Sequence, residues 1–198
     1  FHRGQAARNF VGLDTNKKVS LKPADISPGA EVFIQSTSHN RKIPNRSSVL
    51  LETSVASNMT PTRTHKTMCT SDACVVAGHG LLSAHVVFVV SPIYSAQSQP
   101  SSAEAALKLA VKNALVECAN RNVKTVTLPS IGSGRAGYDK GEAAAWIIEA
   151  IAVYLEDACI NSSQKKQCIE EVCFCLFDNE SLEAYRQGIL AYEKKRDN

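Results

Sequence analysis

A glycine-rich segment, residues 129–138, has the residue types best suited to bind a ligand. It reads Pro-Ser-Ile-Gly-Ser-Gly-Arg-Ala-Gly-Tyr. Glycines let the backbone turn tightly and bring its N–H groups close to an anion, and the positive end of a following helix favours negative charge. The segment lies between a predicted buried strand and a predicted helix, at the edge where open α/β sheets bind ligands. The sequence therefore predicts a loop that holds a diphosphate.

Other interpretations of this segment are weaker. A glycine-rich turn that only connects a strand to a helix would have a similar composition. The sequence has no Gly-Lys-Ser/Thr of a P-loop, and it lacks the acidic residue that follows a first-strand GxGxxG in a dinucleotide fingerprint. The loop must belong to another kind of nucleotide-binding fold.

The elements that position this loop are clearest in the C-terminal half of the chain, where apolar residues recur with clear periods. Ser101 to Glu104 and Asp139 to Glu142 each fit a capping box at the start of a helix. Strands and helices alternate, which predicts parallel strands joined by right-handed crossovers in a layered sheet. The predicted strands are residues 85–92, 123–128 and 172–177, and the predicted helices are residues 101–118, 139–155 and 181–194.

The N-terminal half is less regular. Residues 19–21 and 32–35 indicate short strands, whereas residues 41–70 are rich in Ser, Thr, Asn and Pro and receive no assignment. We expect residues 1–18 to form an extension and residues 19–194 to form a single domain.

The amino-acid composition limits the classes of protein to which this chain can belong. The chain has 198 residues with 22 basic and 19 acidic side chains, a net charge of +3 that is too small to indicate nucleic-acid binding by itself. No apolar run approaches the roughly 20 residues of a membrane-spanning helix. We expect an intracellular protein with reduced cysteines, because most of its seven cysteines fall in predicted core segments. Secretion is the alternative, since four glycosylation triplets begin at Asn45, Asn58, Asn161 and Asn179.

Two stretches make the sequence resemble a known family. "TLPSIGSGRAGYDKGEAA" and "AGHGLLSAHVVFVVSP" look like parts of a macro domain, and the resemblance extends from about Val19 to Tyr192. It implies a three-layer α/β/α fold with a mixed, mostly parallel central sheet. Members of the family typically bind ADP-ribose, so ADP-ribose or an ADP-ribosylated protein is the implied partner, with no cofactor and no metal.

The resemblance also implies roles for individual residues. Asp25 and Ile26 match an aspartate motif that contacts the adenine amine, and Phe177 matches an aromatic that stacks on adenine. Gln35 and Ser38 occupy the family's first loop. The diphosphate contacts carry over to Ile131, Gly132, Ser133, Gly134, Arg135, Ala136 and Gly137.

The first loop departs from the family pattern. Residues 34–38 read Ile-Gln-Ser-Thr-Ser in place of Val-Asn-Ala-Ala-Asn, and the chain has no glycine between Gly29 and Gly78. The asparagine that helps position water in hydrolytic members corresponds to Ser38, and Ala136 stands where many members carry an aromatic. We therefore expect a non-catalytic ADP-ribose reader, forming a monomeric domain of a larger protein.

Three alternatives stay open. The domain could have lost its nucleotide and bind protein or nucleic acid, for which the basic residues scattered through 41–66 would serve. It could be an ADP-ribosyl hydrolase if an acidic residue lies near Ser38. Cys74 with His79 or His85 could form a catalytic pair, although no local motif supports one.

Overall fold

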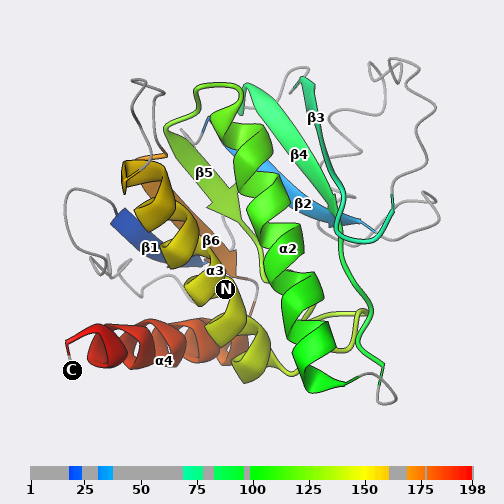
Figure 1. Cartoon of the computed structure of the whole chain (residues 1–198), viewed down its shortest axis with the longest axis vertical. Helices are drawn as coiled ribbons and strands as arrows, with labels where there is room; N and C mark the ends of the chain where they lie inside the picture. The colour runs from blue at the N-terminus through cyan, green and yellow to red at the C-terminus, as the bar shows by residue number, and fades with distance from the viewer. Residues whose placement is uncertain are drawn as a thin grey trace, which may run out of the picture.

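A computed structural model describes residues 18–23, 31–37, 69–77, 83–95, 99–160, 169–176 and 178–197. Figure 1 shows these segments as one sheet with long helices packed on it. Within them, no helix combines the length and the apolar character that crossing a membrane requires.

The sheet has six strands in the order β1-β6-β5-β2-β4-β3. β3 pairs antiparallel with β4, and every other neighbouring pair is parallel. The predicted mixed, mostly parallel sheet is therefore confirmed. The strands are β1 (Lys18–Pro23), β2 (Val32–Thr37), β3 (Ala73–Ala77), β4 (His85–Val90), β5 (Thr125–Leu128) and β6 (Glu171–Leu176).

Three helices belong to the described residues. They are α2 (Pro100–Ala119), α3 (Lys140–Ile160) and α4 (Asn179–Arg196). Figure 1 shows α2 and α3 running over the face of the sheet turned toward the viewer, with α4 packed against α3. Each predicted C-terminal helix is present, within a few residues of its expected bounds.

Apolar periodicity in the sequence accounts for the core. Consecutive residues Val86 and Val87 of β4 are both fully buried, so this strand is covered on both faces, as its continuous apolar run predicted. In α2, Leu107, Val111 and Leu115 recur along one stripe and are also fully buried. The helices and the central strands thus share one hydrophobic cluster.

The predicted capping box at the start of α2 is wrong. The helix begins at Pro100, and the carbonyl of Gln99 accepts the N–H groups of Ser102 and Ala103, while no side chain caps the end. Proline at the first helical position explains the shift, because its fixed φ already suits a helix and its missing N–H needs no partner. Glu104 instead pairs with Lys108, at 2.6 Å.

The structure describes Cys69, Cys74, Cys118, Cys173 and Cys175, which differ in burial. Cys118 and Cys173 are buried, and burial raises the pKa of the Cys118 thiol to about 12. Cys69 is exposed, and it lies in the stretch 41–70 for which the sequence predicted no core segment. No group of three or more metal-ligating side chains occurs in the described part of the chain.

Candidate functional site

The glycine-rich loop connects the middle of the sheet to α3. β5 lies between β6 and β2 and ends at Leu128, and α3 begins at Lys140. Parallel pairing of Phe33 with Thr127 brings the end of β2 beside the start of the loop. The structure therefore places residues 129–139 at the carboxyl edge of the central strands, as predicted.

Two glycines give this loop its shape. Gly132 has φ +85° and Gly137 has φ +81°, a region that residues with a side chain rarely adopt. A Cβ at Gly132 would lie 3.0 Å from Tyr138 Cδ2 and 3.4 Å from Leu107 Cδ1. Gly132 is therefore required both by the backbone conformation and by close packing.

Hydrogen bonds hold the second half of the loop in place. Tyr138 N donates to the Gly132 carbonyl at 3.2 Å, and Gly137 N donates to the Gly134 carbonyl at 3.1 Å. Tyr94 N donates to the Ala136 carbonyl at 2.7 Å, which ties the loop to the segment after β4. Hydrogen bonds within the protein thus define the conformation of the second half of the loop without a ligand.

Aromatic side chains pack around Tyr138 at the end of the loop. Tyr138 is buried, its hydroxyl donates to the Ala103 carbonyl at 3.2 Å, and burial raises its pKa. The Tyr94 and Trp146 rings meet the Tyr138 ring edge-on, with centroids 5.4 and 6.2 Å away. Such edge-to-face pairs favour one orientation of the rings.

The first half of the loop offers unpaired backbone donors. Within the described residues, the N–H groups of Gly132 through Ala136 donate to no protein acceptor. Gly134 and Arg135 are exposed, and a Cβ built at Gly134 meets no atom within 4 Å. Backbone N–H groups need partners, and successive unpaired ones in a turn form anion-binding concavities. The loop can therefore donate several hydrogen bonds to a phosphate.

Hydroxyl groups line the base of the loop, a feature that the sequence did not indicate. Ser130 Oγ and Ser133 Oγ lie 2.6 Å apart. Tyr185 of α4 is fully buried, and burial raises the pKa of its hydroxyl while the nearby Ser130 hydroxyl lowers it. The Tyr185 hydroxyl makes no hydrogen bond of ordinary geometry within the described residues. The loop thus rests on α4 as well as on α3.

The start of α3 is less available to a ligand than the sequence indicated. Asp139 Oδ1 accepts the N–H groups of Gly141 and Glu142, at 2.9 and 3.0 Å. The capping role predicted for Asp139 is confirmed. Since its carboxylate already occupies these amides, the donors for an anion must come from the loop itself rather than from the end of the helix.

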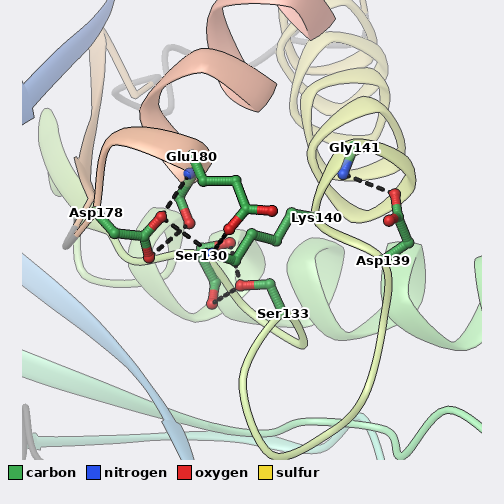
Figure 2. A network of polar contacts seen from close by, with 8 residues as sticks. Ser130, Ser133, Asp139, Lys140, Gly141, Asp178 and Glu180 are labelled. Atoms are coloured by element: carbon green, nitrogen blue, oxygen red, sulfur yellow. Dashed lines mark hydrogen bonds and ion pairs between the residues drawn. The ribbon is translucent and has the colours of Figure 1, made fainter.

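A charged cluster joins the starts of α3 and α4 (Figure 2). Lys140 Nζ lies 3.0 Å from Asp178 Oδ1 and 2.6 Å from Glu180 Oε2, and these contacts raise its pKa, that with Glu180 most. Asp178 caps α4 by accepting Ser181 N at 2.7 Å, which is the main reason that its pKa is lowered. Sequence reasoning missed this cluster because its members are nearly 40 residues apart, as the separation of 38 between Lys140 and Asp178 shows.

The predicted site residues fall into four groups. Asp25, Ile26, Ser38 and Phe177 lie outside the described residues. Gln35 is in β2, whose end is beside the loop, and its side chain is not described. Ile131 as a whole is fully buried in the core, so the contact with a diphosphate predicted for it is not available in this conformation. Of the remaining loop residues, Gly132 is buried, Ser133 and Ala136 are partly exposed, and Gly134, Arg135 and Gly137 are exposed.

Comparison with known proteins agrees with this geometry. A family model of the macro domain matches residues 54–147. Histone macroH2A1.1 of Capsaspora owczarzaki is 35% identical over 126 residues, which are 64% of this chain and 32% of that protein. The ADP-ribose glycohydrolase MACROD1 of Rattus norvegicus is 27% identical over 131 residues, 66% of this chain and 47% of that protein. The chain thus matches less than half the length of either relative.

The fold also matches solved structures. A macrodomain of Oceanobacillus iheyensis with ADP superposes with a TM-score of 0.79 at 16% identity, covering 96% of this chain and 100% of the other. Likeness at such low identity speaks for the fold, and the sequence matches speak for the family. The chain therefore has the macrodomain fold, and its residues 54–147, which include the glycine loop, are similar to a macro domain.

Proposed function

We propose that this domain binds ADP-ribose without hydrolysing it, and that it recognises ADP-ribosylated proteins. The observation that carries the proposal is the row of N–H groups from Gly132 to Ala136, at the carboxyl edge of the sheet, for which the described part of the chain provides no acceptor. A diphosphate has several oxygens that accept hydrogen bonds, and preformed backbone donors bind such a group with little loss of conformational freedom. The ADP in the Oceanobacillus iheyensis structure supports the choice of ligand.

The nucleoside half of the ligand would lie at the neighbouring strand ends. We propose that Asp25 and Ile26 contact the adenine, that Phe177 stacks on it, and that Gln35 and Ser38 line the ribose. The position of β2 beside the loop supports the place given to Gln35. Arg135 is exposed on the loop and adds positive charge for the diphosphate.

The test is titration calorimetry with ADP-ribose on the wild-type domain and on Gly134→Glu. The new side chain enters open space, because nothing lies within 4 Å of a Cβ at Gly134. It would place a carboxylate where the diphosphate belongs, and two like charges about 4 Å apart repel by roughly 4 kcal/mol near a protein surface. We expect the affinity to fall at least about a hundredfold, with an unchanged melting temperature.

Gly134→Gln is the matched control, because it has the same size and no charge. It should weaken binding less than Gly134→Glu does. Equal affinity of Gly134→Glu and wild type would place the ligand elsewhere. A wild-type domain that takes up no ADP-ribose would instead favour a macro domain that binds protein or nucleic acid.

Hydrolysis of ADP-ribosyl groups is the second candidate, and the likeness to the rat ADP-ribose glycohydrolase favours it. Incubation of the domain with a labelled ADP-ribosylated protein separates the two functions. A reader retains the label on the protein, whereas a hydrolase releases it with turnover.

A further inference from the structure

Lys140 stands at the junction between the glycine loop and α3 and is held by two carboxylates. Its ammonium group contacts Asp178 Oδ1 at 3.0 Å and Glu180 Oε2 at 2.6 Å. The Lys140 side chain is 28% exposed, while that of Glu180 is 77% exposed. Because this lysine lies between two carboxylates, its positive charge offsets their negative charges. Without the lysine, those negative charges would act on neighbouring groups.

The surroundings are the proposed diphosphate site. Figure 2 shows the Ser130–Ser133 pair of the loop beside the Lys140 cluster, close to the start of α4. Asp178 and Glu180, at the start of α4, therefore lie at the same edge of the sheet as the loop N–H groups of residues 132–136, which have no acceptor among the described residues. Negative charge at this end opposes the binding of an anion.

Asp178 and Glu180 differ in the groups that offset their negative charge. Asp178 accepts hydrogen bonds from Ser181 N and Ser181 Oγ, at 2.7 and 3.1 Å, besides its contact with Lys140. Within the described residues, Glu180 has Lys140 as its ion-pair partner. Among the described residues, loss of the lysine would remove the cation that pairs with both Glu180 and Asp178.

We infer that Lys140 is an electrostatic positioning residue of the anion site, which offsets Asp178 and Glu180 and so raises the affinity for a diphosphate without touching it. This inference rests on the proposed function. It adds to that function a residue that the family resemblance did not point to, and it assigns the two acids an unfavourable effect on binding.

A purely structural role would have a different consequence. If the cluster served only to join α3 to α4, breaking it from either side would loosen the loop and weaken binding. If Lys140 acts through its charge, removing the lysine weakens binding, whereas removing the Glu180 carboxylate strengthens it. The direction of the Glu180→Gln effect therefore separates the two roles.

The experiment is calorimetric titration of ADP-ribose into the wild-type domain and four variants at low salt, where exposed charges are least screened. We expect Lys140→Met to bind about three- to tenfold more weakly and Lys140→Arg to stay within about twofold of wild type, as charge-mediated couplings of this kind are modest. Glu180→Gln should bind up to about threefold more tightly by the same reasoning. Lys112→Met, an exposed lysine of α2, is the matched control and should be unchanged.

Three results would overturn the inference. Lys140→Met with wild-type affinity would show that its charge does not reach the site. Weaker binding by Glu180→Gln, or equal losses in Lys140→Met and Lys140→Arg, would assign the cluster a structural role. In each of these cases wild type still binds and the proposed function stands, whereas wild type that binds no ADP-ribose removes both.

Discussion

Two strand-to-helix junctions lie side by side at the carboxyl edge of the sheet, and they are built differently. β5 and α3 are separated by residues 129–139, whereas only residues 177 and 178 separate β6 from α4. Both helices begin after an aspartate, and in both the carboxylate accepts N–H groups of the first turn. At the short junction the Asp178 carboxylate accepts Ser181 N, whereas at the long one the N–H groups of residues 132–136 have no protein acceptor among the described residues.

The difference teaches where anion affinity comes from in this molecule. A helix start is a general anion site, but here Asp139 already accepts two N–H groups at the start of α3 and Asp178 accepts one at the start of α4. The additional loop residues supply the donors, and its glycines let the backbone take the required turn. The following variants test whether one side chain, Tyr185, stabilises both junctions and whether the glycine loop affects stability and binding by itself.

Tyr185→Ala should have the largest effect, because this side chain supports both junctions. The ring is fully buried, its centroid lies 4.5 Å from that of Phe174, and its hydroxyl lies near Ser130. Truncation of a buried aromatic to alanine costs about 3–5 kcal/mol. We expect a loss of that size in the free energy of unfolding measured with urea.

Tyr185→Phe is its control. The hydroxyl lacks a hydrogen bond of ordinary geometry within the described residues, so its removal should change stability by less than about 1 kcal/mol. A large loss in Tyr185→Phe would instead show that the hydroxyl bonds the loop strongly.

Gly132→Ala should have the next largest effect and should act on the long junction alone. Alanine at φ +85° is strained, and its Cβ would meet Tyr138 Cδ2 at 3.0 Å. We expect a loss of about 2 kcal/mol in urea unfolding, together with weaker ADP-ribose binding. Gly134→Ala, with open space around its Cβ, should lose no stability. Equal stability of the two variants would contradict the conformation described for the loop.

The caps should have the smallest effects, and they should be similar at both junctions. Asp139→Ala and Asp178→Ala each remove a carboxylate that caps a helix, which costs about 1 kcal/mol. The pKa of Asp178 is lowered by folding, so its contribution is fully present above its ordinary value of 3.8 and is lost as the pH falls through the lower folded value. The stability difference between wild type and Asp178→Ala should therefore shrink when urea unfolding is repeated at pH 3. A difference that persists there would mean that packing, not charge, stabilises this cap.

The order of strands and helices in the C-terminal half was predictable, because each element has its own apolar period. The capping of α3 was predictable too, since Asp139 reaches amides only two and three residues away. The start of α2 was mispredicted, since a serine and a glutamate fitted a capping box while Pro100 set the helix start by its fixed φ. A capping box and an N-terminal proline can each start a helix, and the sequence alone does not show which of the two does so here.

The candidate site was predictable in its position and in part of its chemistry. Gly132, Gly134 and Gly137 were recognised because they fall between a predicted buried strand and a predicted helix, where open α/β sheets bind ligands. The occupation of the helix amides by Asp139 and the burial of the Ile131 side chain were not predicted. Asp25, Ile26, Ser38 and Phe177 remain predictions from the family resemblance.

The sequence by itself determined the α/β class, the glycine loop and its place between a strand and a helix, because these depend on residues close together in the chain. Only the tertiary structure decided which loop amides are left without a partner, that Tyr185 lies beneath Ser130, and that Lys140 contacts Asp178 and Glu180. These contacts join β5–α3 to β6–α4 across many residues of chain. Parallel pairing of β5 with β6 brings the two junctions together, and no periodicity in the sequence records that pairing.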